Sequence, residues 1–165
     1  MPPAAASTET AVTRWLDPTE MIAWRSYIDC INDLQHALEA DLVPFGLTMG
    51  DYEVLVRLSD RSDRRMRMCD LAGQLGLSPS GLTRRLDGLV STGLVSREAS
   101  DDDRRVMLAV LTDDGYAVLE RAAPFHLRGV RRHFIDLLTA GEVRAVASAF
   151  TKVRAALAGQ HTSPS

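Results

Sequence analysis

The feature that most constrains the fold is a run of short elements in the middle of the chain, separated by glycine and proline. Gly76 suits the left-handed residue that ends a helix, and Pro79, directly after Ser78, suits the first turn of the next. Two strand-like apolar runs follow, joined by a charged segment. Helix, tight turn, helix and hairpin in this order predict a winged helix-turn-helix. The expected elements are a polar loop at 60–65, helices at 67–75 and 79–92, and strands at 94–98 and 106–111.

The second helix of this run has one apolar face and one polar face. The apolar face is made by residues at steps of four, three and one, which are Leu82, Leu86, Leu89 and Val90. The other face carries small polar residues and arginines, which reach phosphates and base edges in the major groove of DNA. Arg85 is a candidate for a phosphate contact. The expected DNA-binding residues of this segment are Ser78, Ser80, Gly81, Thr83, Arg84 and Arg85.

The segment between the two strands is a candidate wing, although three of its residues, Asp101 to Asp103, are acidic. A carboxylate beside an arginine can hold it in one rotamer, and a narrow minor groove attracts a guanidinium. We therefore expect Arg105 to enter a minor groove, with Asp103 supporting the wing, and Arg104 to contact phosphate or solvent. A merely solvated turn is the alternative for this segment.

The distribution of charge supports a nucleic-acid partner better than the net charge does. The chain has a formal net charge of −3, but the segment from Arg57 to Arg105 has ten arginines and eight acidic residues. Positive charge is therefore concentrated in the middle third, around the predicted DNA-binding helix and wing.

The flanking segments predict a dimerisation scaffold. Asp17 and Pro18 mark the start of a long helix, whose apolar stripe from Trp24 to Leu42 is expected to end at Pro44. Apolar residues in the C-terminal third predict further helices, interrupted at Gly141, and one small domain cannot bury all of these faces. The fold class is mainly α with a small β-hairpin wing (α+β). The expected division is a disordered tail at 1–16, a dimerisation helix at 17–46, a winged domain at 47–111, dimerisation helices at 112–158 and a disordered tail at 159–165.

Three motifs together resemble the MarR family of bacterial regulators, over about residues 17–157. The resemblance implies a triangular homodimer in which two winged domains read a palindrome in double-stranded DNA. It also implies that small phenolic or otherwise aromatic ligands bind between the dimer helices and the winged domain and lower the affinity for DNA. The motifs are Leu47-Thr48-x3-Tyr52-x-Val54-Leu55, the helix pair around Ser78, and Asp103-Arg104-Arg105 followed by Leu108-x2-Leu111-Thr112-x2-Gly115.

The expected function is thus a homodimeric repressor that binds a palindromic operator and is released by a small aromatic ligand. Candidate ligand-binding residues cluster near the junction of the first two helices, although aromatic residues at helical spacing are more often core residues. These candidates are Trp24, Tyr27, Met49 and Tyr52.

Two alternatives to this function stay open. One is a redox-sensing regulator that uses a cysteine, although Cys30 and Cys69 are expected to be small buried residues. The other is a winged-helix interaction module that does not bind DNA.

Catalysis is not expected, because the sequence has no nucleophile motif and no phosphate-binding loop. His126 and His133 are expected on the surface without a metal ion, and no cofactor is expected. No run of about 20 apolar residues and no signal peptide is visible, so we expect a cytoplasmic protein that does not bind membranes.

Overall fold

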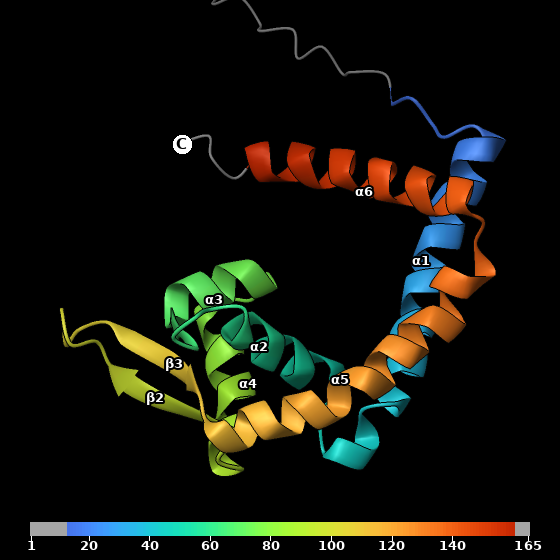
Figure 1. Cartoon of the computed structure of the whole chain (residues 1–165). Helices are drawn as coiled ribbons and strands as arrows, with labels where there is room; N and C mark the ends of the chain where they lie inside the picture. Colours follow the sequence, from blue (N-terminus) through green and yellow to red (C-terminus); the bar gives the residue numbers. More distant parts are fainter. Residues whose placement is uncertain (1–12, 161–165) are drawn as a thin grey trace, which may run out of the picture. The chain divides into compact units, whose positions relative to one another are not determined.

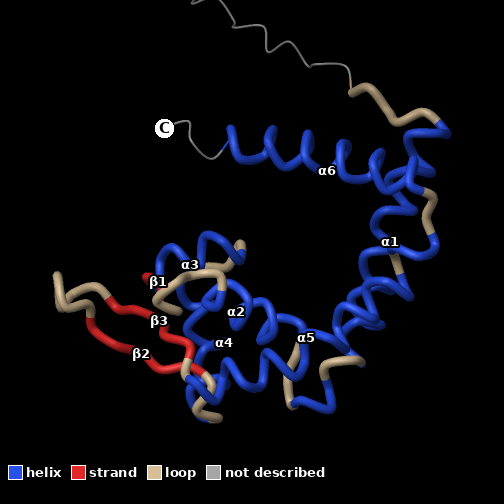
Figure 2. The backbone as a smooth tube through the Cα atoms, in the orientation of Figure 1, coloured by secondary structure: helices blue, strands red, loops and turns tan. Residues whose placement is uncertain are grey.

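The computed structural model describes residues 13–160, and helices make up most of it (Figures 1 and 2). By their contacts these residues form two compact units, the first ending at Asp33 and the second beginning at Leu34. Each unit is described by itself below. The elements are α1 (Pro18–Ala40), the 3-10 turn η1 (Val43–Phe45), α2 (Met49–Ser59), β1 (Arg65–Arg67), α3 (Met68–Leu75), α4 (Pro79–Ser91), β2 (Val95–Ala99), β3 (Met107–Leu111), α5 (Asp113–His133), the 3-10 turn η2 (Ile135–Leu137) and α6 (Ala140–Gln160).

The middle of the chain forms the expected helix, turn, helix and hairpin, which in order are α3, α4, β2 and β3 (Figure 1). The hairpin belongs to a three-stranded antiparallel sheet with the order β1-β3-β2. The prediction of a polar loop and a helix start was wrong at 65–67, where β1 pairs with β3 through Met66 opposite Ala109. Local pattern cannot reveal this strand, because only its central residue is buried and its partner lies over 40 residues away in the sequence.

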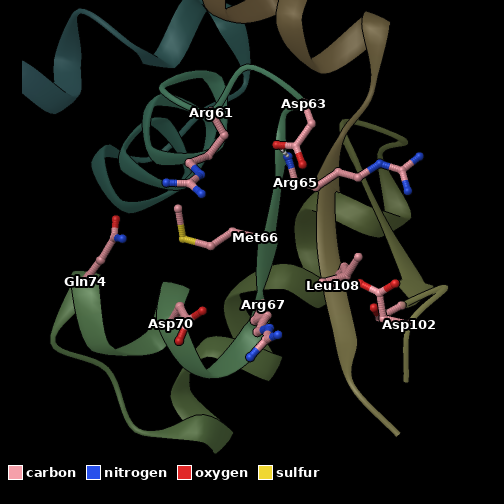
Figure 3. Close-up of a pocket in the computed structure, with 10 residues that line it drawn as sticks. Arg61, Asp63, Arg65, Met66, Arg67, Asp70, Gln74, Asp102 and Leu108 are labelled. Carbon is pink, nitrogen blue, oxygen red and sulfur yellow. Dashed lines mark hydrogen bonds between the residues drawn. The ribbon is translucent and has the colours of Figure 1, made fainter. Parts of the chain in front are cut away.

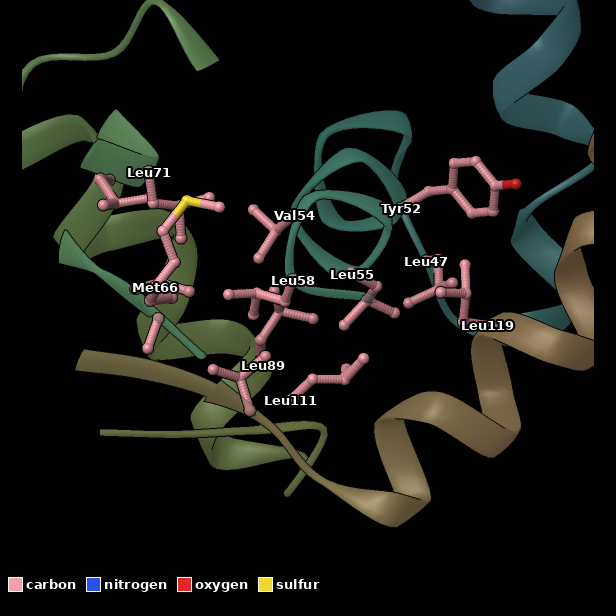
Figure 4. Packing of buried hydrophobic residues seen from close by; sticks show 14 of the residues in the cluster. Leu47, Tyr52, Val54, Leu55, Leu58, Met66, Leu71, Leu89, Leu111 and Leu119 are labelled. Carbon is pink, nitrogen blue, oxygen red and sulfur yellow. The ribbon is translucent and has the colours of Figure 1, made fainter. Parts of the chain in front are cut away.

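The core lies where α2, α3 and α4 meet the sheet and α5 (Figure 4). Leu55, Leu58, Leu71 and Leu86 are completely buried there. Each such side chain contributes roughly 1.5–3 kcal/mol through its removal from water. This core fixes α4 by its buried face and leaves the opposite face of the helix outside.

Side-chain caps determine where the helices of this domain begin. Thr48 and Asp51 form the expected capping box, with the Asp51 N–H donating to Thr48 Oγ1 and the Thr48 N–H donating to Asp51 Oδ2, both at 3.1 Å. The side chain of Thr112 accepts from the Gly115 N–H in the same way. Gly76 ends α3 with a φ of 63°, the left-handed conformation expected for it.

Two helix ends differ from the prediction. Helix α1 ends at Ala40 and not near residue 43, because the backbone tightens there into 3-10 turns, in which the Asp41 and Leu42 N–H groups donate to carbonyls three residues back. The C-terminal interruption lies at 134–139 and not at Gly141, which falls in the first turn of α6. Thr139 and Glu142 form a capping box that starts this helix, a signal that the sequence analysis missed.

Several burial predictions also need correction. Val90 was expected on the buried face of α4, but it lies at the edge of that face and is 37% exposed. Both Cys30 and Cys69 are exposed within this chain, not buried. His126 and His133 were expected on the surface and are instead half-buried on α5. None of the described helices combines the length and the apolar character needed to cross a membrane.

Candidate nucleic-acid interface

Helix α4 is positioned by its cap and by its buried leucines. The side chain of Ser78 accepts a hydrogen bond from the Gly81 N–H at 3.1 Å, and Pro79 occupies the first turn. Leu82, Leu86 and Leu89 fasten the helix to the core. As a result, Ser80, Thr83 and Arg84 point away from the core and are exposed.

The hydroxyl groups on this helix already have intrahelical partners. Ser78 and Ser80 are 3.2 Å apart between their Oγ atoms, and the Thr83 hydroxyl donates to the Pro79 carbonyl at 2.9 Å. Each hydroxyl oxygen retains lone pairs that can accept a further hydrogen bond. Arg84 is the exposed arginine of this helix.

Arg85 differs from Arg84 in being half-buried. Its guanidinium lies against Gly50 in the first turn of α2, where a Cβ atom would overlap it. Together with Arg84, Thr48 and Gly81, it lines an open depression of about 460 Å³ between α2 and α4. The predicted phosphate-binding residue is thus held at the boundary between these two helices.

Arg97, on β2, joins α4 to the wing and was not identified from the sequence. Its Nη2 donates to the Thr83 carbonyl at 2.9 Å and to Asp87 Oδ1 at 2.8 Å. Both acceptors belong to α4, so one guanidinium fixes the angle between the helix and the strand that leads into the wing. No local sequence pattern signals this ion pair, because Asp87 and Arg97 lie on different elements.

The wing is shaped by its backbone and by one carboxylate. Asp103 Oδ1 accepts a hydrogen bond from the Arg105 N–H at 3.0 Å, and its carbonyl accepts from the Val106 N–H at 2.8 Å. We expected Asp103 to hold an arginine side chain, but the recorded bonds hold the turn itself. Arg104 and Arg105 are both exposed at the tip.

A polar cavity of about 360 Å³ lies beside the wing, between β1 and α3 (Figure 3). Three arginines that the sequence analysis did not assign line it, and Arg65 among them pairs with Glu98 at 3.2 Å. Three aspartates balance these arginines, so the cavity has no strong preference for one sign of charge. The charged residues around it are Arg61, Asp63, Arg65, Arg67, Asp70 and Asp102.

The candidate ligand-binding residues fall in both compact units. In the first unit the rings of Trp24 and Tyr27 are 6.0 Å apart, and Trp24 is 54% exposed. In the second unit Met49 packs against the core, and the ring of Tyr52 lies 4.5 Å from that of His126. The first pair belongs to one unit and the second pair to the other, so a single ligand site made of all four residues stays a prediction.

Burial changes the pKa values of Tyr52 and His126. It raises the pKa of the Tyr52 hydroxyl above its ordinary value. It also lowers the pKa of His126, against the opposing effect of the carboxylates of Asp41 and Glu53. Nδ1 of His126 and Oδ2 of Asp41 are buried without a hydrogen-bond partner among the described residues. One of these atoms lies just after α1 and the other on α5, beside the ring of Tyr52 on α2.

Comparison with known proteins agrees with this arrangement. The model of the MarR family matches residues 47–107, which run from the start of α2 to the first residue of β3. AbsC, a MarR family transcriptional regulator from Streptomyces coelicolor, is 44% identical and superimposes with a TM-score of 0.85 over 89% of this chain and 99% of its own. The chain belongs to the MarR family of transcriptional regulators.

Two further relatives are a regulator solved with DNA and a repressor. Sco3205, also from S. coelicolor, was solved in complex with DNA and is 35% identical with a TM-score of 0.82 over 86% of this chain and 89% of its own. The transcriptional repressor YetL of Bacillus subtilis is 31% identical over 111 residues, 67% of this chain. The aligned region spans 66% of YetL, just under two thirds of its length. The family and these relatives are transcriptional regulators, not enzymes.

Proposed function

We propose that this MarR-family regulator is a homodimeric repressor that binds a palindromic operator in double-stranded DNA. The observation that carries the proposal is the exposed face of α4, which presents Thr83 and Arg84 beside a wing tipped by Arg105. Helix α4 would enter the major groove, where Arg84 binds a base edge, and Arg105 would enter the adjacent minor groove. That the similar Sco3205 was solved in complex with DNA supports DNA as the partner. Such a regulator acts in the cytoplasm.

The exposed apolar residues of the outer helices support the homodimer. In α1, Ile22 and Trp24 are 67% and 54% exposed, and in α6, Val153 and Leu157 are 54% and 53% exposed. A stable soluble protein rarely leaves such faces in water, and a second copy of the chain would cover them. Two α4 helices about 34 Å apart would then fit successive major grooves.

The unsatisfied polar atoms near Tyr52 support control by a small ligand. A molecule with an aromatic ring and a hydroxyl or carboxyl group could pack against Tyr52 and satisfy His126 Nδ1. If it preferred the released form of the dimer by about 1–3 kcal/mol, it would lower the affinity for DNA 5- to 150-fold.

A binding titration tests the DNA-binding function. The purified protein is titrated into labelled duplexes that cover the upstream region of its own gene, at about 50 and about 200 mM salt. We expect tight binding that weakens steeply with salt. Arg84→Ala should cost roughly 1–3 kcal/mol and relax the preference at one base position, whereas Arg105→Ala should weaken binding to most sequences. Lys152→Ala on α6 is the charge-matched control.

Three outcomes would contradict the proposal. The absence of binding to any duplex at low salt would favour the interaction module instead. Unchanged binding by both arginine variants would remove α4 and the wing from the interface. A stable monomer in analytical ultracentrifugation would exclude the dimeric scaffold.

A further inference from the structure

Gly50 leaves room for the guanidinium of Arg85. A Cβ atom at position 50 would overlap Nη1 and Cζ of Arg85 and would lie 2.8 Å from Nη2. The space that every other residue type fills with its first side-chain carbon is therefore occupied here by an arginine from another helix. The two residues come from α2 and α4, which are in contact.

The guanidinium of Arg85 is not held in place by a polar partner within the described residues. Within residues 13–160, no hydrogen bond or ion pair from Arg85 to another residue is recorded, in contrast to Arg97 on the neighbouring strand. Its donors are left beside the depression that Arg84 also lines, on the flank of α4 between its buried leucines and its exposed face. An arginine with free donors beside a DNA-binding helix suits a phosphodiester oxygen.

We propose that Gly50 is a positioning residue for DNA binding, because its missing side chain lets Arg85 lie between α2 and α4 and contact a backbone phosphate of the operator. This inference rests on the proposed DNA-binding function and goes beyond it by assigning a role to a residue outside the helix-turn-helix. Arg85 is half-buried with its guanidinium against Gly50, so part of the cost of ordering this side chain is already met before DNA binds.

The alanine variant at this position separates positioning from folding. At Gly115, a Cβ atom would overlap the Leu94 carbonyl oxygen, which is backbone and cannot move aside. At Gly50 it meets only the flexible end of a side chain, so Gly50→Ala should displace Arg85 and leave the fold intact. Because alanine is the better helix former, the melting temperature should not fall.

The experiment is a double-mutant cycle on the full-length protein, with a duplex that the wild type binds. Arg85→Ala should lower the affinity roughly tenfold and reduce the slope of log K against log salt by about 0.9 per subunit. Gly50→Ala should change both quantities in the same direction. In the Arg85→Ala background it should have no further effect. Gly73→Ala in α3, where nothing lies within 4 Å of the added Cβ, is the matched control and should bind like the wild type.

Each contrary result has a distinct meaning. Normal binding by Gly50→Ala together with weak binding by Arg85→Ala would show that the phosphate contact does not need the space at Gly50. Additive losses would show that the glycine acts independently of Arg85, and unchanged binding by Arg85→Ala would remove the contact altogether. Any of these overturns the inference and leaves the proposed function standing, whereas a wild type that binds no duplex overturns both.

Discussion

Replacing Arg97 by alanine tests whether the wing strand holds the DNA-binding helix in place. Arg97 Nη2 bonds to the Thr83 carbonyl and to Asp87, whose side chain is 60% exposed. The exposed ion pair contributes below about 1 kcal/mol, while the charge-assisted bond to the carbonyl contributes about 1.5–3 kcal/mol. The Arg97 Nε, buried without a partner among the described residues, offsets part of this gain. We expect Arg97→Ala to lower the free energy of unfolding by about 2 kcal/mol and Asp87→Ala by about 0.5 kcal/mol.

Urea denaturation followed by circular dichroism measures these differences, and fluorescence anisotropy with operator DNA measures their functional effect. A loss of about 2 kcal/mol leaves a typical domain folded, so any fall in DNA affinity reports the orientation of α4 relative to the wing. We expect Arg97→Ala to bind more weakly than Asp87→Ala. Equal unfolding free energies for the two variants, or wild-type affinity in Arg97→Ala, would refute the role given to the bond with Thr83.

Three further predictions concern the stability of the folded chain. Leu58→Ala should lower the free energy of unfolding by about 2–5 kcal/mol in urea denaturation, because Leu58 is fully buried, and a loss below about 1 kcal/mol would contradict the assigned core. Thr48→Ala should cost about 1 kcal/mol by the same method through loss of the α2 cap, and Thr48→Ser should restore most of it. Since burial lowers the pKa of folded His126, the unfolded chain takes up its proton first, and stability should fall as the pH drops through about 6.5. Urea titrations measure the free energy of unfolding at about pH 7.5 and about pH 5.5. The difference between the two values should be smaller in His126→Asn than in the wild type. An equal difference in both proteins would assign the effect to other groups.

Helix boundaries were predictable from the sequence where one side chain sets them. The residue that caps a helix lies within three positions of the N–H it satisfies, so Thr48, Ser78 and Thr112 could each be recognised from a few letters. The wing strands were also predictable, because both are apolar and flank a charged turn. These features were predictable because the residues that determine them are close together in the sequence.

Features that depend on distant residues were missed. Strand β1 exists because Met66 finds a partner in β3, and nothing in the three residues of β1 specifies that partner. The exposure of Cys30 and Cys69 is a property of helix orientation, which their small apolar character does not encode. The contact of His126 with Tyr52 likewise depends on how α5 packs against α2.

The same distinction applies to the candidate site. The residues on the exposed face of α4 follow from its periodicity, and so they could be chosen from the sequence. The residues that position them could not, since Arg97 acts from β2 and Gly50 from α2. A glycine in the first turn of a helix gives no sign of an arginine 35 positions later, although the geometry links the two.

The acidic residues near the proposed interface need not oppose DNA binding by a chain with a net charge of −3. Three of these carboxylates already have local partners: Asp51 bonds to Thr48 in the α2 cap, Asp87 pairs with Arg97, and Asp103 accepts from the backbone of the wing. Each stabilises the geometry of an element that carries a DNA-binding candidate. Within the described residues, no such ion pair is recorded for the four arginines proposed to face DNA, Arg84, Arg85, Arg104 and Arg105. The affinity for DNA should therefore follow these arginines rather than the net charge, because a phosphate interacts most strongly with charges that lie within a Debye length, about 10 Å at 0.1 M salt.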